Sequence, residues 1–265
     1  MRTRIIACDF DGTLYIDGAI APEDCEALAR WRAAGHLAVG ATGKSIASVR
    51  EAVEPHGVEL DFYALYNGTV ITDGQFRVLA EEHLPAASVR AIAEHFHGRA
   101  GLNVYVTTLA GPDALLWRGV EGIDNPIIPD AQLMSLDELG ESGAGHAILL
   151  SVWAPGDAAL QREVREWVTG NFDFDTSFNT GFFDIMPPGH NKGAGLTWLL
   201  DHLGLRRGDV DLYTFGDGHN DLSMHALADA SFAPPHALPE VRDAVTHVVP
   251  SVAVSYTHLT LPTKA

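Results

Sequence analysis

The 265-residue sequence has few cysteines and no long apolar run. Its two cysteines, Cys8 and Cys25, are too few for a disulfide framework, so we expect reduced thiols in a cytoplasmic protein. The apolar stretches are all shorter than the ~18 residues that a membrane-spanning helix needs, which argues against a membrane partner. The N-terminus leads at once into a strand pattern, so we expect no signal peptide.

Positive charge is also scarce. Lysine and arginine number 17 against 35 aspartates and glutamates, which makes the formal net charge −18. Such an excess disfavours nucleic acid and anionic membranes as partners. It also repels phosphorylated ligands at long range, so a phosphate site would need local cations such as a bound divalent metal. A small-molecule ligand, and a monomer or weak homo-oligomer, are what we expect.

Apolar strand patterns alternate with helical patterns from the N-terminus to about residue 66, in the order strand, helix, strand, helix, strand. This order predicts an α/β fold with a doubly wound, mostly parallel sheet. The pattern changes at about residue 82, where strands of antiparallel character and two helices surround a loop-rich stretch. We therefore predict a core domain at 1–81 and 187–254, with a second α/β domain inserted at 82–186.

The last eleven residues, 255–265, do not continue the core pattern. They carry neither a helical period nor a helix cap where a closing helix is expected. The stretch resembles the translated read-through of a sequencing adapter. We interpret 255–265 as a non-native tail and leave it out of the fold prediction.

Two aspartates follow the first predicted strand. The apolar run at 5–8 ends in Asp9, and Asp11 lies two residues on, so both carboxylates share a face while the chain stays extended. Gly12 then allows a sharp turn. One carboxylate could be a nucleophile or metal ligand and the other an acid/base, although Asp and Gly are also ordinary turn residues.

Three further polar clusters stand at strand ends or helix starts of the same predicted domain. Each alone has a structural explanation, such as a helix cap or a solvated lysine. Their joint place at the carboxyl edge of one sheet, where open α/β sheets bind ligands, favours a functional site. The clusters are Thr42-Gly43-Lys44, Lys192, and Asp217 with Asn220-Asp221.

The order of these motifs resembles the haloacid dehalogenase (HAD) superfamily of phosphohydrolases. The resemblance covers nearly the whole chain and is closest to the Cof-type branch, whose α/β cap of type IIB interrupts a Rossmann-like core. It is carried by 9–14, 42–44, Asn67-Gly68, 184–193 and 216–224, and 239–244 also looks like this branch.

The resemblance implies a Mg²⁺-dependent phosphatase acting on a small organic phosphate monoester, such as a sugar phosphate. Asp9 would attack phosphorus to form an aspartyl-phosphate, and Asp11 would act as acid and then as base. Phosphoryl oxygens would be held by Thr42, Gly43, Lys44 and Lys192. Mg²⁺ would be held by Asp9, the Asp11 carbonyl and Asp217, with Asn220 and Asp221 supporting the metal shell. Carboxylate ligands and positioned cations suit phosphoryl transfer.

The sequence departs from the branch at two places. Lys44 stands where the branch usually has arginine, which keeps the charge but loses the bidentate fork and weakens the case for a phosphate contact there. His236 precedes Ala237 where the branch often has asparagine. We expect that change to affect only a peripheral contact.

Several other functions are open to these motifs. A P-loop is disfavoured because Ala38 stands where the spacing to Gly43-Lys44 needs glycine. A phosphotransferase or phosphomutase of the same superfamily would use the same residues. A non-enzymatic phospho-accepting signalling module is a further alternative, but it needs neither the acid/base Asp11 nor an inserted cap.

The substrate is not named by the sequence. In the resembling family the cap supplies the pocket for the leaving group. We expect specificity residues in cap loops such as 119–130 and 177–182, where Phe178, Asn179 and Phe182 could meet a small polar organic phosphate.

Overall fold

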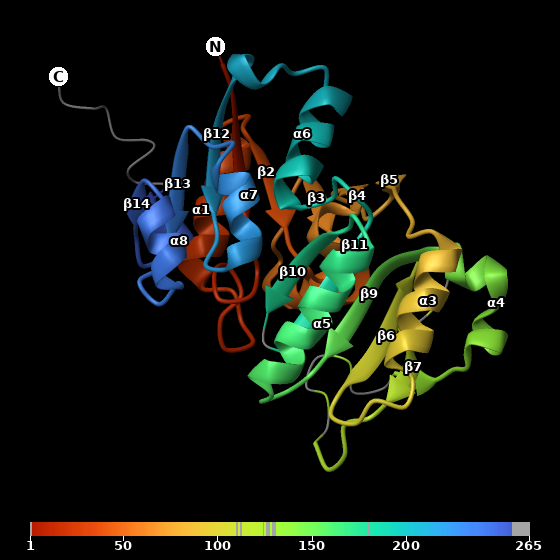
Figure 1. Cartoon of the computed structure of the whole chain (residues 1–265). Helices are drawn as coiled ribbons and strands as arrows, with labels where there is room; N and C mark the ends of the chain where they lie inside the picture. Colours follow the sequence, from red (N-terminus) through yellow and green to blue (C-terminus); the bar gives the residue numbers. More distant parts are fainter. Residues whose placement is uncertain are drawn as a thin grey trace. The chain divides into compact units, whose positions relative to one another are not determined.

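The computed structural model of the chain describes residues 2–109, 111, 113–123, 125, 128, 131–179 and 181–255, and of 141, 142 and 179 it describes the backbone alone. Contacts divide the chain into two compact units. One consists of Met1–Ala80 with Asn191–Ala265, and the other of Glu81–His190 (Figure 1). The predicted domain limits at 81/82 and 186/187 stay a prediction of where a separate cap begins and ends.

The first unit is built on an eight-stranded sheet in the order β14-β13-β12-β1-β2-β3-β4-β5. The pairs from β14 to β3 are parallel, and β4 turns back antiparallel to β3. The strands are β1 (Thr3–Cys8), β2 (Leu37–Ala41), β3 (Phe62–Leu65), β4 (Val70–Asp73), β5 (Val78–Glu81), β12 (Val210–Phe215), β13 (Ala230–Ala233) and β14 (His247–Val248). The predicted mostly parallel α/β fold is confirmed.

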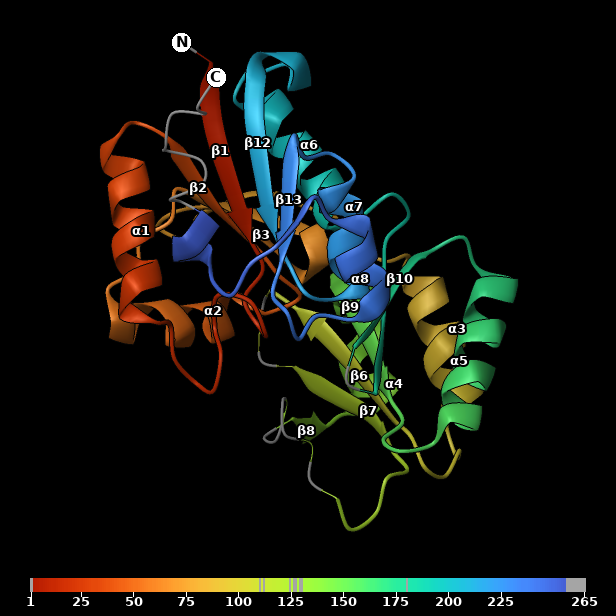
Figure 2. The same cartoon turned by 90° about the vertical axis from the view of Figure 1, so that its left-hand side faces the viewer.

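Helices cover both faces of this sheet. Figure 2 shows α1 and α2 on one side of it and α6 and α7 on the other. Strand positions alternate accordingly: Ile5 and Ala7 pack with Leu196 and Leu199 of α6, since side chains two apart share a face. The helices are α1 (Pro22–Ala33), α2 (Ile46–Val53), α6 (Lys192–His202), α7 (Leu222–His225) and α8 (Pro239–Ala244).

The second unit is a mixed sheet of order β10-β11-β9-β6-β7-β8. Its largest hydrophobic core joins one face of this sheet to the helices, with Val104, Leu150 and Ile185 packed against Val89 and Val164. The elements are α3 (Ala86–Phe96), β6 (Asn103–Thr108), β7 (Ala114–Arg118), β8 (Gln132–Leu133), α4 (Leu136–Ala144), β9 (Ala147–Trp153), α5 (Ala158–Asn171), β10 (Asp175–Asn179) and β11 (Phe182–Met186).

One local expectation needs correction. Residues 177–179 belong to strand β10 and not to a loop, because they pair with β11 in antiparallel register. The interpretation of 255–265 as a non-native tail stays a prediction; its first residue, Ser255, is fully buried, and its hydroxyl donates to the Val252 carbonyl at 2.5 Å. Residues 256–265, the rest of the predicted tail, lie outside the described residues.

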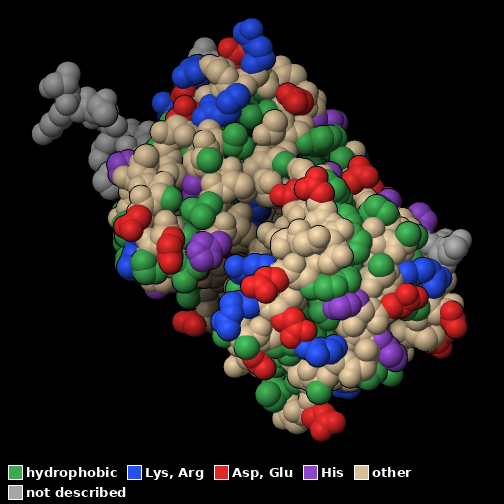
Figure 3. All heavy atoms as spheres, in the orientation of Figure 1, with side chains coloured by type: hydrophobic (Ala, Val, Ile, Leu, Met, Phe, Trp, Pro, Cys, Tyr) green, Lys and Arg blue, Asp and Glu red, His purple; other side chains and the backbone are tan. Residues whose placement is uncertain are grey.

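The surface and the helices agree with the composition. No helix in the described ranges is long and apolar enough to cross a membrane. Figure 3 shows acidic and basic side chains interspersed over the face that it presents.

Candidate active site

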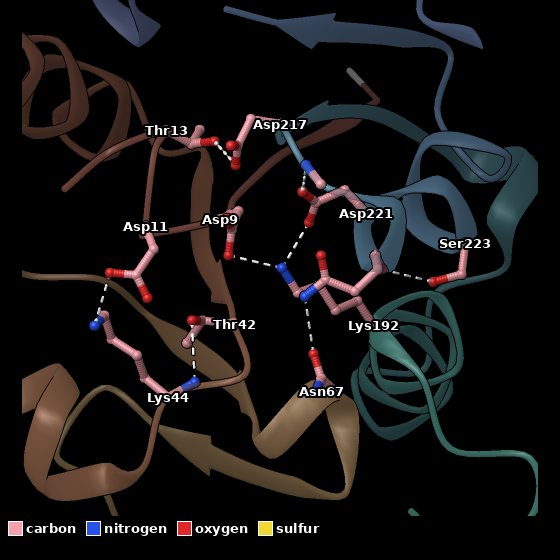
Figure 4. Close-up of polar contacts among 12 residues, drawn as sticks. Asp9, Asp11, Thr13, Thr42, Lys44, Asn67, Lys192, Asp217, Asp221 and Ser223 are labelled. Atoms are coloured by element: carbon pink, nitrogen blue, oxygen red, sulfur yellow. Dashed lines mark hydrogen bonds and ion pairs between the residues drawn. The ribbon is translucent and has the colours of Figure 1, made fainter. Parts of the chain in front are cut away.

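Asp9 follows β1 at the carboxyl edge of the core sheet. Side chains two residues apart on a strand share a face, so the Asp9 side chain lies on the same face as Ile5 and Ala7, the face covered by α6. The Asp9 N–H donates to the Phe215 carbonyl at 2.9 Å. This backbone bond ties the ends of β1 and β12 together, so that the loops following them meet. Asp9 is 6 % exposed, and Figure 4 shows its carboxylate directed toward Lys192.

Lys192 is the first residue of α6 and is completely buried. Its Nζ donates to Asp9 Oδ1 at 2.7 Å and to Asp221 Oδ1 at 2.6 Å. The helix starts there because the Asn191 side chain caps it, accepting from the Ala194 N–H at 2.9 Å. Burial alone would lower the pKa of Lys192, but Asp221 and Asp9 raise it above its ordinary value. The side chain is therefore an ammonium held by two carboxylates.

Asp217 lies in the loop after β12, against Gly12. Gly12 has a φ of +75°, and a Cβ there would lie 2.5 Å from Asp217 Oδ2, so glycine is required on both counts. Thr13 Oγ1 donates to Asp217 Oδ1 at 3.2 Å. Burial raises the pKa of Asp217, and the Asp9 charge raises it further. The loop after β1 and the loop after β12 therefore pack against each other through Gly12, Thr13 and Asp217.

Thr42, Gly43 and Lys44 follow β2. Thr42 is buried, and its Oγ1 accepts a hydrogen bond from the Lys44 N–H at 3.2 Å, as expected of a turn-forming threonine. The Gly43 backbone lies beside the Asn67 side chain. Lys44 forms an ion pair with Asp11, with Nζ 2.8 Å from Asp11 Oδ1. The predicted phosphate contact from Lys44 thus competes with this ion pair.

Asn220 and Asp221 lie in the short helical segment His219–Asp221 that precedes α7. Asp221 is fully buried; besides Lys192 it accepts from the Gly218 N–H at 2.9 Å through Oδ2. Burial raises the pKa of Asp221, while Lys192 opposes the shift. Asn220 Nδ2 donates to Asn67 Oδ1 at 3.0 Å. Both predicted supporting residues therefore lie at the site, and Asp221 contacts Lys192 directly, which the sequence did not indicate.

Three carboxylates here could hold a metal ion. Asp9, Asp217 and Asp221 each offer an oxygen within 4.8 Å of the others. When ionised, they carry an excess of two negative charges over the Lys192 ammonium that lies among them. Oxygen donors and that charge excess fit a hard divalent cation such as Mg²⁺. The residues present therefore fit the metal that the sequence motifs imply.

The predicted specificity residues of the second unit lie on two faces of its sheet. Phe178 packs against the helix-side core, with the Arg165 guanidinium over its ring, and its role as a ligand contact stays a prediction. Phe182 lies on the opposite face in a cluster with Tyr105 and Trp153. Asn179 pairs with Phe182 in the sheet; of Asn179 the structure describes the backbone alone.

Some contacts at the site were not anticipated from the sequence. Thr13 binds Asp217, and the Ser223 hydroxyl accepts from the Gly193 N–H at 3.1 Å where α6 and α7 meet. His236 Nε2 lies 2.7 Å from the Gly12 carbonyl oxygen. The close approach of α6 and α7 leaves one trace in the sequence, the glycine at position 193. A Cβ there would lie 2.4 Å from the Ser223 carbonyl oxygen. His236 carries no such signal, since 224 residues separate it from its partner.

Fold and site together define an α/β enzyme with paired carboxylates and a buried lysine at the carboxyl edge of its sheet. The family model of the haloacid dehalogenase-like hydrolases matches residues 6–254. The chain belongs to this family. The predicted relationship is thereby confirmed.

Curated relatives and solved structures agree with this assignment. The chain is 28% identical over 232 residues to the HMP-PP phosphatase of Cronobacter sakazakii, covering 85% of this chain and 81% of that protein. It is 28% identical over 228 residues to the HMP-PP phosphatase of Yersinia pseudotuberculosis serotype I, covering 83% and 80%. A solved HAD subclass IIB sugar phosphatase has the same fold, with a TM-score of 0.80, 21% identity and coverage of 97% and 99%.

Proposed function

We propose that the chain is a Mg²⁺-dependent phosphatase that hydrolyses a small organic phosphate monoester through a phosphoryl-aspartate at Asp9. The observation that carries the proposal is the buried contact of Lys192 with Asp9 and Asp221. A buried ammonium beside a carboxylate nucleophile can neutralise an incoming phosphoryl group. An ammonium has three N–H donors, and among the described residues two of them have these carboxylates as partners, which leaves one for a phosphoryl oxygen.

The residues then have the following roles. The Asp9 carboxylate attacks phosphorus, while Lys192 and Thr42 bind the phosphoryl oxygens. Asp11, whose side chain is 55 % exposed, protonates the leaving alcohol and later takes a proton from the water that attacks the phosphoryl-aspartate. Mg²⁺, held by Asp9 and Asp217 with Asp221 behind them, would supply the charge that lets a carboxylate approach an anionic ester.

The substrate class is supported by the second unit. On the face of its sheet opposite α3 and α5, Tyr105, Trp153 and Phe182 form an apolar cluster. Beside it, Ser151 Oγ donates to Asp184 Oδ1 at 2.6 Å, and Ser151 pairs with Tyr105 across the sheet. The three rings are buried and the Asp184 carboxylate is only half-buried, so the rings would form the apolar support of a leaving group whose hydroxyl or amine donors reach Asp184. Sugar phosphates and HMP-PP, the ligands named for similar proteins, are therefore the esters to test first.

The test is a panel of phosphate esters assayed with Mg²⁺ and with excess chelator. We expect turnover that requires Mg²⁺ and falls at least about a thousandfold in Asp9→Asn, as for other lost nucleophiles. Full activity of Asp9→Asn, or of the wild type in chelator, would refute the mechanism. Phe182→Ala should raise KM for the preferred ester with little change for p-nitrophenyl phosphate, and Phe178→Ala is its matched control.

A phosphotransferase or phosphomutase would use the same residues. The two possibilities differ in what accepts the phosphoryl group from Asp9. Release of inorganic phosphate in proportion to alcohol product supports the phosphatase, whereas transfer to an added sugar without phosphate release supports the alternative. Repeated turnover of either kind argues against a signalling module, whose phosphoryl-aspartate must persist.

A further inference from the structure

The turn between β13 and α8 is fixed at both of its ends. Ala237 is buried with Ala233 and Val241, and its N–H donates to the Pro234 carbonyl at 3.0 Å. The Arg242 guanidinium donates to the Pro235 carbonyl at 2.6 Å. These bonds fix the backbone of the turn on both sides of His236, so the His236 side chain projects from a backbone held in place.

This turn contacts both acidic loops of the site. His236 Nε2 lies 2.7 Å from the Gly12 carbonyl oxygen. The Leu238 N–H donates to the Asp217 carbonyl at 3.3 Å. A carbonyl oxygen has no hydrogen to give, so the imidazole must carry its proton on Nε2 and act as the donor. The turn therefore bridges the loop that holds Asp11 and the loop that holds Asp217.

The Gly12 peptide lies in the sharp turn of the first loop, where Gly12 has a positive φ. Glycine has no side chain of its own to hold the positive φ found there, and the conformation is entropically costly for it. The same peptide unit carries the Thr13 N–H, which donates to the Phe10 carbonyl at 3.0 Å. A rotation of this peptide would move Asp11 on one side and Thr13, with its bond to Asp217, on the other.

We propose that His236 is a positioning residue for phosphoryl transfer, acting by its hydrogen bond to the Gly12 carbonyl. The bond holds the Gly12 peptide and thereby sets where the Asp11 carboxylate and the Asp217–Thr13 pair lie. This inference rests on the proposed function. His236 is itself exposed, so its ring is not part of the core, and its replacement should leave the fold intact.

The test compares His236→Leu, which has no donor, with His236→Gln, whose amide can place an N–H near the position of Nε2. His202→Leu, at an exposed position of α6, is the matched control. We expect His236→Leu to lower kcat about tenfold with KM within about threefold, the effect of one lost hydrogen bond of ordinary strength. His236→Gln should recover most of that loss, and all three variants should melt at the wild-type temperature in chelator.

A second measurement does not depend on turnover. Because the bond sets the place of Asp217, the rise in melting temperature on adding Mg²⁺ should be smaller in His236→Leu than in the wild type and restored in His236→Gln. Wild-type kcat and a wild-type Mg²⁺ response in His236→Leu would overturn the proposal, as would equal losses in the Leu and Gln variants. An inactive wild type would refute the proposed function, and the Mg²⁺ response would still decide the role of His236.

Discussion

Lys44 Nζ lies 2.8 Å from Asp11 Oδ1, and the Lys44 ammonium also lies 5.5 Å from the centre of the Tyr15 ring. The candidate acid/base is therefore held by a lysine that the sequence motif assigned to the substrate phosphate. A lysine binds as a point charge on a flexible stem, so it can serve one carboxylate without a fixed geometry. We infer that Lys44 acts by orienting Asp11.

This inference predicts a specific kinetic coupling. Lys44→Met should lower kcat about tenfold for an alkyl phosphate, since the Asp11 carboxylate loses its partner, whereas Lys44→Arg should keep most of the activity. In an Asp11→Asn background, Lys44→Met should cost little further, because the two residues act as a unit. If the two losses instead multiply, measured as kcat in a double-mutant cycle, Lys44 binds the phosphate independently of Asp11.

The acid role of Asp11 predicts a dependence on the leaving group. An alkoxide needs a proton as it departs, whereas p-nitrophenolate is stable without one. Asp11→Asn should therefore reduce kcat by about a hundredfold or more for an alkyl phosphate and by much less for p-nitrophenyl phosphate. Single-turnover rates of release of the two alcohols measure this difference. Equal losses for both esters would contradict a proton transfer from Asp11.

His225 predicts a pH dependence of stability. Its ring is 6 % exposed, with Nδ1 2.8 Å from Thr214 Oγ1. Burial lowers the pKa of His225 to about 4, well below the ~6.5 of an unfolded histidine. Between these values the unfolded state binds more protons than the folded state. The stability that the neutral ring supports is complete above about pH 6.5 and is lost as the pH falls toward 4, by roughly 3 kcal/mol.

The measurement is the difference between wild type and His225→Asn in the free energy of unfolding, obtained by urea titration in chelator from pH 7 to pH 4. Taking the difference removes the titration of other groups. The wild-type advantage should shrink as the pH falls, whereas exposed His202→Asn should follow the wild type throughout. Parallel curves for wild type and His225→Asn would show that the ring does not titrate as described.

The end of the described chain predicts two outcomes for two truncations. The Ala253 N–H donates to Asp24 Oδ1 at 2.7 Å, and Val252 and Ser255 are buried. A chain that ends at Ser255 should keep the wild-type melting temperature and activity. A chain that ends at Pro250 should melt lower by on the order of 5 °C or more, since it loses a buried valine and a charge-assisted hydrogen bond. A large loss in the first truncation would show that residues 256–265 contribute to the fold.

Much of the site could be predicted because chain order determines it. Asp9, Thr42 and Asp217 each follow an apolar strand, and parallel strands bring their carboxyl ends to one edge of the sheet. Lys192 begins α6, the helix that precedes β12 in the chain, and it lies at the same edge. Such convergence depends on the order of strands and helices, which apolar patterning indicates, and not on the details of side-chain conformation.

The finer contacts could not be predicted, because they depend on rotamers and loop geometry. Nothing in the pattern distinguishes a Lys44 that binds Asp11 from one that binds phosphate. Phe178 and Phe182 look alike in sequence, and only the register of β10 and β11 places them on opposite faces. His236 meets Gly12 through two loops whose shapes are set by tertiary packing.

The central claim is that Asp9 is the nucleophile, and trapping the covalent intermediate tests it most directly. The enzyme is mixed with Mg²⁺ and its preferred ester, quenched in acid within one turnover, and reduced with borohydride, which converts an aspartyl-phosphate to homoserine. We predict homoserine at position 9 by peptide mass spectrometry, present only when Mg²⁺ and ester are both added, and more abundant in Asp11→Asn if loss of the base slows hydrolysis. Turnover of the ester with Asp9 unmodified, or with homoserine at another aspartate, would contradict the account.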